Sequence, residues 1–269
     1  MFFLVLQLKR LRMLIRSALP RLHVNLNKGA MLSMNYDKVV RSLQGSARER
    51  VPLLQNLFVS TGAAVVSFID PSRGDMVALL SELTGEPALR KMHAKMLESE
   101  KGREILQTRP RLKLSSLSPL RPGFPEGSFG RAYCDYLDQY HFNPDERSEV
   151  MFVRDESLAY VLQRYREIHD LFHVLTGLPP TLLGETTLKW FEMIQTGLPM
   201  TIVSAFVAPL RLNHQEKIAF HRVYAPWATQ AGKSCVHLMN VNYEKRWNEP
   251  LQKVRQDLNI IPAPIYKSE

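Results

Sequence analysis

Apolar residues recur at steps of three and four along most of the chain, which is the spacing of helices that bury one face. The clearest run begins after Asp155, whose side chain can cap a helix, and stops at Gly177, which suits the left-handed position that ends one. Its apolar members are Leu158, Val161, Leu162, Tyr165, Ile168, Phe172 and Leu175. Leu178-Pro179-Pro180 enforces a turn, and a second helix is then expected from about Thr181 to Thr196.

Further helices are predicted on both sides of this pair. They cover Asp70–Leu83, Pro87–Met96, Ser99–Leu106, Met200–Ala208, His214–Val223, Ala231–Trp247 and Pro250–Leu258. Between Arg109 and Gly130, closely spaced prolines and glycines predict a long loop. Alternating strand patterns are nearly absent, and no internal repeat is visible. The sequence therefore predicts an all-α protein with a single helical domain.

The net charge of +9 comes mainly from one end of the chain. Residues 1–36 hold six Lys and Arg and no acidic residue, which leaves +3 for the remainder and no indication of nucleic-acid binding. An acid-free, Arg-bearing start is typical of a mitochondrial transit peptide, although a partial secretory signal or an unrelated leader fits the same pattern. We expect a leader over residues 1–34 and a helical domain over 35–269.

The charge-free segment Val51–Ile69 contains proline, glycine and several polar residues. It is more polar than a typical membrane-spanning helix, so we expect a buried or membrane-touching helix there. Cys134 and Cys235 lie far apart without a CxxC partner, which indicates reduced thiols and excludes a disulfide scaffold.

The most informative group is an HDxxH motif followed after eleven residues by a glutamate. Its members are His169, Asp170, His173 and Glu185. Two histidines four residues apart share one helix face, and the turn at Leu178–Pro180 would bring Glu185 back toward them. This donor set suits Zn²⁺, and equally Fe²⁺ or Mn²⁺. The alternative is that the histidines lie in the core and bond the two carboxylates without a metal.

Other site types have less support. The motif lacks the catalytic Glu of HExxH proteases, the further ligands of HD-type phosphohydrolases and the two Glu-x-x-His pairs of ferritin-like di-iron proteins. GxGxxG, P-loop and GxSxG motifs are absent. Among the other residues near the motif, we expect a solvated helix face formed by Arg164, Arg166 and Glu167. We expect Lys189 and Glu192 to form a surface ion pair beside a packed Trp190.

The segment Asp155–Asp170 closely resembles the ubiquinone biosynthesis protein family called Coq-four, whose hallmark is HDxxH, eleven residues and Glu. Similar segments occur at residues 70–78, 102–106, 127–133, 188–192 and 226–228, and the resemblance runs from about Tyr36 to Pro262. The visible departures are Ser157, where an acidic residue is common, and Ser128, where Thr is usual.

The resemblance implies an all-helical protein, peripheral on the matrix side of the mitochondrial inner membrane and associated with other ubiquinone-synthesis enzymes. It also implies a zinc-dependent removal of the carboxylate from ring carbon one of the lipid 4-hydroxy-3-methoxy-5-polyprenylbenzoate, either simple or oxidative with hydroxylation. The ligands would be the four motif residues, and the proton donor stays unassigned. A lipid-binding organiser with a structural metal is the second function that fits, and a homodimer is a further candidate assembly.

Overall fold

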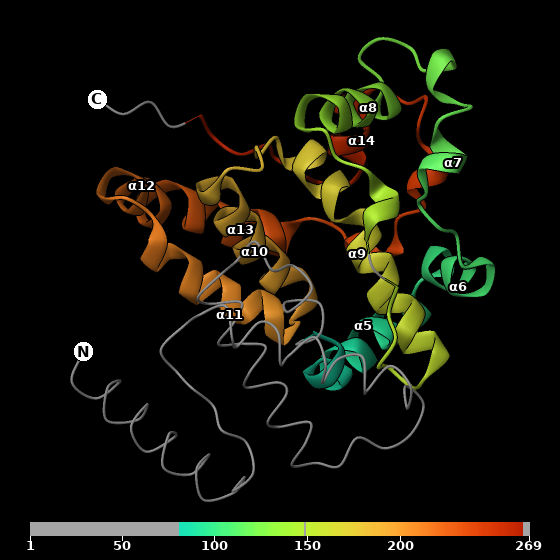
Figure 1. Ribbon diagram of the computed structural model, residues 1–269, viewed down its shortest axis with the longest axis horizontal. Helices are drawn as coiled ribbons and strands as arrows, with labels where there is room; N and C mark the ends of the chain where they lie inside the picture. The colour runs from blue at the N-terminus through green and yellow to red at the C-terminus, as the bar shows by residue number, and fades with distance from the viewer. Residues whose placement is uncertain (1–80, 148, 266–269) are drawn as a thin grey trace, which may run out of the picture. The chain divides into compact units, whose positions relative to one another are not determined.

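The computed structural model describes residues 81–147 and 149–265, and the secondary-structure elements within them are helical (Figure 1). In these two ranges, strand-like pairing is limited to an isolated bridge between Ser128 and Pro250. The all-α prediction is therefore confirmed. The expected leader, the charge-free segment 51–69 and the helix start at Asp70 lie outside the described residues.

Ten α-helices are described, and short 3₁₀ turns join several of them. They are α5 (Glu86–Glu98), α6 (Glu100–Thr108), α7 (Leu114–Leu117), α8 (Phe129–Tyr140), α9 (Glu156–Thr176), α10 (Leu182–Thr196), α11 (Pro199–Val207), α12 (His214–Ala219), α13 (Ala225–Ser234) and α14 (Leu251–Asp257). One π-helical turn, Phe220–Tyr224, connects α12 to α13.

Helix α9 is central to the described part of the chain: 18 of its 21 residues are buried. In Figure 1 it lies among the other helices, with α5 and α8 beside it. Its side chains also contact those of α10, as between Phe172 and Phe191. The apolar residues that predicted the helix are all in its core-facing set, but the burial continues around the whole helix. Such a helix must also bury its charged side chains, so the expected solvated face at Arg164, Arg166 and Glu167 is wrong.

The ends of α9 and α10 follow the expected chemistry. The Asp155 carboxylate accepts hydrogen bonds from the backbone N–H groups of Ser157 and Leu158, and Gly177 ends α9 with a φ of 73°. Thr181 caps α10. A Cβ atom at Gly184 would lie 1.9 Å from the Pro179 carbonyl oxygen, so the close approach of turn and helix requires glycine there.

The last carbonyl groups of α9 are bonded by the C-terminal part of the chain. The Arg255 guanidinium donates to the carbonyl oxygens of Val174 and Leu175, both at 2.9 Å. The backbone N–H of Ala263 donates to the Thr176 oxygen at 2.7 Å. These contacts satisfy acceptors that a helix end otherwise leaves to water, and they fix the end of α9 that carries the candidate site.

The predicted helix from Ala231 to Trp247 is wrong beyond Ser234, where α13 ends. The chain continues through 3₁₀ turns at Leu238–Asn240 and Tyr243–Lys245. Side chains from other helices bond this backbone instead. The Gln195 side-chain oxygen accepts from the Leu238 N–H at 3.1 Å, and Arg164 donates to the Val241 oxygen at 3.2 Å. An α-helix would use those backbone groups internally.

Candidate metal site

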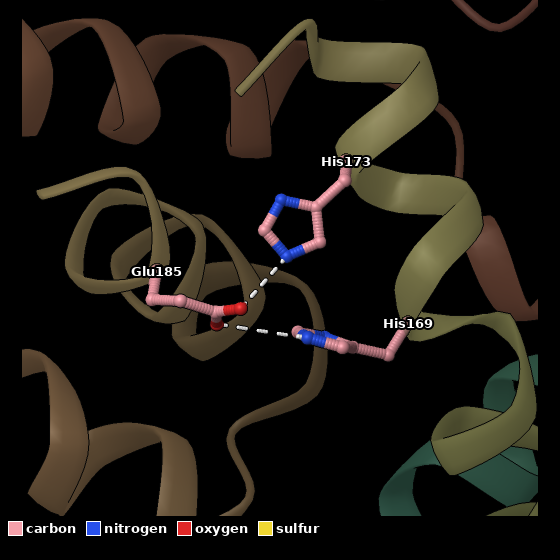
Figure 2. A group of neighbouring side chains, drawn as sticks. All are labelled: His169, His173 and Glu185. Atoms are coloured by element: carbon pink, nitrogen blue, oxygen red, sulfur yellow. Dashed lines mark hydrogen bonds and ion pairs between the residues drawn. The ribbon is translucent and has the colours of Figure 1, made fainter. Parts of the chain in front are cut away.

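Three of the four predicted ligands converge between α9 and α10. His169 and His173 lie one turn apart on α9, and Glu185 comes from the first turn of α10 (Figure 2). The Glu185 carboxylate lies 3.1 Å from Nε2 of His173 and 3.7 Å from Nε2 of His169. One ligand atom from each residue lies within 4.8 Å of the other two, so a single cation could contact all three.

Both histidines turn the same ring nitrogen toward the glutamate, because the other nitrogen is already bonded. Nδ1 of His173 lies 2.9 Å from the Leu178 carbonyl oxygen, which can only accept. Nδ1 of His169 lies 2.6 Å from a carboxylate oxygen of Glu192. A neutral histidine that donates from Nδ1 keeps its lone pair on Nε2, which is the form a metal requires.

The aromatic ring of Tyr136 on α8 packs against the ring of His173, with centroids 5.6 Å apart and an interplanar angle of 20°. Together with the bond to Leu178, this contact restricts the His173 side chain, which is fully buried. The third ligand differs, because 38% of the Glu185 side chain is exposed. The histidine side of the site on α9 is therefore held in place, whereas the site is open toward solvent at Glu185.

The electrostatics of the three residues are linked. Burial alone would raise the pKa of Glu185, but the neighbouring imidazoles of His169 and His173 hold it well below its usual 4.5. Burial and nearby Lys189 would lower the pKa of His169, whereas Glu192 and Glu185 raise it by more, to above 6.5. Ligand atoms that hold protons in this way can also bind a metal cation in place of the protons.

The fourth predicted ligand, Asp170, has a different neighbour. Its carboxylate pairs with the Arg147 guanidinium, and it is not part of the three-residue cluster. Two buried phenol groups on α8, Tyr133 and Tyr136, feel its charge, since burial and Asp170 together raise the pKa of each. Their hydroxyls have no hydrogen-bond partner in the described part of the chain. Asp170 as a metal ligand stays a prediction.

The donor set fits a divalent transition metal. Two imidazole nitrogens and one carboxylate occur both in catalytic zinc sites and in non-haem iron sites, so zinc, iron and manganese all remain candidates. In the described residues both Nε2 atoms are aimed at one point, and both Nδ1 atoms have acceptors that fix that orientation. Three protein ligands leave coordination positions for a substrate.

Lys189 and Glu192 form the expected ion pair, with the ammonium 2.7 Å from the carboxylate, but the pair is buried and not on the surface. Glu192 is fully buried and accepts hydrogen bonds from three sides, one of them from His169. Burial would raise its pKa, but Lys189 and His169 lower it to about 2. The sequence did contain a signal: residues 185, 189 and 192 are spaced by four and three, and so they share one face of α10.

Comparison with known proteins identifies the relatives of this chain. The sequence model of the family described as "Coenzyme Q (ubiquinone) biosynthesis protein Coq4" matches residues 47–264. A mitochondrial ubiquinone biosynthesis protein COQ4 homolog from Xenopus tropicalis is 48% identical over 217 residues, covering 80% of this chain and 77% of that protein. The homolog of the same name from Bos taurus is 46% identical, covering 81% of this chain and 83% of its own.

A solved structure agrees with the fold. The crystal structure of a proposed ubiquinone biosynthesis protein from Nostoc punctiforme superposes with a TM-score of 0.59, covering 74% of this chain and 95% of that one. Its sequence identity is 16%, so the likeness concerns the fold alone.

Proposed function

The chain belongs to the Coq4 family of ubiquinone biosynthesis proteins, and from this we propose that it removes the ring carboxylate of a ubiquinone precursor at the site on α9 and α10. A role in ubiquinone biosynthesis follows from the family, and the relatives are named as mitochondrial. The proposed substrate is 4-hydroxy-3-methoxy-5-polyprenylbenzoate. The proposed metal is Zn²⁺, with Fe²⁺ or Mn²⁺ as alternatives.

The observation that carries the proposal is the partly open three-ligand cluster. The Nε2 atoms of His169 and His173 and the Glu185 carboxylate point toward one another, and the Glu185 side is 38% exposed. A structural site commonly has four protein ligands and is closed, whereas a catalytic site keeps a position for its substrate. A metal held here supplies electrostatic attraction that can orient a carboxylate.

The reaction balances with a proton alone. C1 of the ring takes up one proton, and the para-hydroxyl oxygen stabilises the resulting cation, a protonated dienone. The bond from C1 to the carboxylate then breaks, its electron pair returns to the ring, and CO₂ leaves. His169 and His173 are fixed by their Nδ1 bonds, so they are already oriented before the substrate arrives. An oxidative version would add a hydroxyl at C1, would need an external oxidant and would give a different product.

One observation favours a second function. The cluster joins two helices, since two ligands lie on α9 and the third lies on α10. A metal there would also hold the helices together, as in a structural site. In that case the chain is a lipid-binding organiser that presents the polyprenyl intermediate to partner enzymes. In both functions we propose attachment to the matrix side of the inner membrane, together with other ubiquinone-synthesis enzymes.

The deciding experiment uses the purified full chain, synthetic prenylated substrate and elemental analysis. We expect about one divalent metal per chain in the wild type, near zero in His169→Ala, and release of CO₂ that stops after chelation and returns with added metal. Equal, near-zero metal in both proteins would refute the metal site. Bound metal without turnover, together with a large loss of thermal stability on chelation, would support the organiser instead.

A further inference from the structure

A buried polar network lies behind His169, on the side away from Glu185. Its centre is the Glu192 carboxylate on α10, which is fully buried. One oxygen lies 2.6 Å from Nδ1 of His169, and the other lies 2.7 Å from both the Lys189 ammonium and the Tyr165 hydroxyl. Lys189 also lies 3.3 Å from Nδ1 of His169.

The partners of Glu192 determine which group holds each proton. An ammonium and a phenol hydroxyl both donate to the carboxylate, so its oxygens act as acceptors. The remaining neighbour, Nδ1 of His169, must then donate as well. This places the proton of neutral His169 on Nδ1 and its lone pair on Nε2, which faces Glu185 at 3.7 Å.

Lys189 opposes this arrangement. Its ammonium is close enough to Nδ1 of His169 to donate to it if Glu192 were absent. Nδ1 would then be an acceptor, the ring proton would move to Nε2, and that nitrogen could not bind a metal. Lys189 is also a positive charge next to a site proposed to take a cation, and the two repel.

We propose that Glu192 is a positioning residue that sets the His169 tautomer and thereby raises the affinity for the bound metal, and that Lys189 weakens binding so that the metal stays exchangeable. The inference rests on the proposed metal site and adds residues outside the HDxxH motif to it. Carboxylates that bond a ligating histidine in this way usually contribute about 10- to 100-fold to metal affinity.

The test measures Zn²⁺ affinity of the full chain by competition with a chelating dye. We expect Glu192→Gln to weaken Zn²⁺ binding by about 10- to 100-fold. We expect Lys189→Met to strengthen it by roughly 3- to 10-fold, because a repelling charge is removed. A purely structural network would instead lose affinity in both variants, since each leaves a buried partner unpaired.

Glu167→Gln is the matched control. Glu167 on α9 is also a buried carboxylate that accepts from three donors, namely Arg111, the Leu112 N–H and Gln163, but it does not contact a proposed ligand. Its loss should lower thermal stability about as much as the loss of Glu192 and leave Zn²⁺ affinity unchanged. An equal loss of affinity in both glutamine variants would overturn the proposal.

A spectroscopic readout separates tautomer control from folding. ¹⁵N NMR of metal-free protein, at a pH where His169 is neutral, should show Nδ1 protonated in the wild type and a shift toward Nε2 protonation in Glu192→Gln. If that variant does not fold, Tyr165→Phe removes one bond to Glu192 while keeping the ring, and should weaken Zn²⁺ binding several-fold.

The outcomes distinguish the two proposals. A wild-type protein that binds no Zn²⁺ refutes the metal site on which the proposed function depends. If Glu192→Gln and Tyr165→Phe bind Zn²⁺ as tightly as the wild type and the His169 tautomer is unchanged, the role of Glu192 is refuted and the metal site is not.

Discussion

At the scale of single residues, Asp170 and Glu185 are both carboxylates of the predicted ligand set, but their surroundings differ. Asp170 is buried and pairs with Arg147, whose side chain is 30% exposed. Glu185 is partly exposed, and its carboxylate lies 3.1 Å from His173 and 3.7 Å from His169. Removing Asp170 therefore leaves a cation without its partner, whereas removing Glu185 takes a donor from the metal cluster.

We expect these two residues to separate stability from metal content. Asp170→Ala should lower the free energy of unfolding by about 1–3 kcal/mol, less than for a fully buried pair because Arg147 reaches water. Glu185→Ala should cost less than about 1 kcal/mol in metal-free protein and should remove most of the bound metal. Urea unfolding and elemental analysis of the same preparations measure both quantities.

The double variant Asp170→Ala/Arg147→Met is the control, because it removes both charges. It should be more stable than Asp170→Ala alone. If Asp170→Ala kept full stability and lost its metal as Glu185→Ala does, Asp170 would be a ligand, as the sequence motif predicted. Loss of ubiquinone synthesis is expected for both single variants.

His237 gives a prediction for pH. Burial, helped by the charge of Lys95, lowers its pKa from 6.5 to about 4, and its Nε2 atom has no hydrogen-bond partner in the described residues. The unfolded chain therefore takes up a proton near pH 6.5 that the folded chain takes up only near pH 4. Stability should fall by about 1–3 kcal/mol as the pH decreases through that window.

Urea unfolding at several pH values, with wild type and His237→Gln, measures this effect. The glutamine variant cannot gain the proton, so its stability should depend less on pH across the window. Parallel curves for the two proteins would show that another group is responsible.

At the scale of secondary-structure elements, the charged residues of α9 bond partners on other parts of the chain. Arg164 pairs with Glu244, Arg166 with Glu82 at 2.8 Å, and Glu167 with Arg111 at 2.6 Å. These side chains leave the helix in different directions, so they fix its rotation as well as its position. The orientation of His169 and His173 toward α10 depends on that rotation.

The ion pair between Arg164 and Glu244 tests how strongly these contacts hold α9 in place. Arg164 is fully buried, and it bonds Glu244 through both terminal nitrogens. Glu244→Ala should lower the free energy of unfolding by about 2–4 kcal/mol, because it leaves a buried guanidinium unpaired. The double variant Arg164→Met/Glu244→Ala should recover part of that loss. Thermal and urea unfolding of a double-mutant cycle measures the coupling, and simple additivity would contradict it.

Local signals were sufficient for the helices that form the site. Helix α9 begins after Asp155 and ends before Gly177, as the sequence predicted, and α10 ends at Thr196 as expected. The three clustered ligands come from one helix–turn–helix segment, so their spacing alone brought them together.

Long-range partners could not be predicted in the same way. The carboxylates that pair with Arg164 and Arg166 lie 80 and 84 positions away, so no local pattern indicated that this face of α9 is buried. The prediction of a helix beyond Ser234 was wrong for a related reason, since Gln195 and Arg164 bond the backbone there. The helical spacing places Glu192 on the same face of α10 as Glu185, but its burial depends on the packing of α9 against α10.

At the scale of the whole molecule, the prediction concerns membrane attachment. Among the described helices, none is long and apolar enough to cross a bilayer. Residues 51–69 lie outside the described part, and their polar residues argue against a spanning helix there. We therefore expect alkaline carbonate to release the protein from mitochondrial membranes. An integral inner-membrane protein is the control that stays in the pellet, and retention of this chain with it would refute peripheral attachment.

The bonds from Arg255 and Ala263 to the end of α9 have a consequence for the order in which the site is completed. A ribosome or an import channel delivers the chain from its N-terminus, so α9 and α10 arrive while the end of α9 still lacks these partners. A late stop codon after Pro250 would keep all three clustered ligands and still remove that support. We expect such a chain to retain little metal by elemental analysis and to be degraded early. A mutation far from the HDxxH motif, in the segment that holds Arg255 and Ala263, could therefore abolish the protein as completely as one in the motif itself.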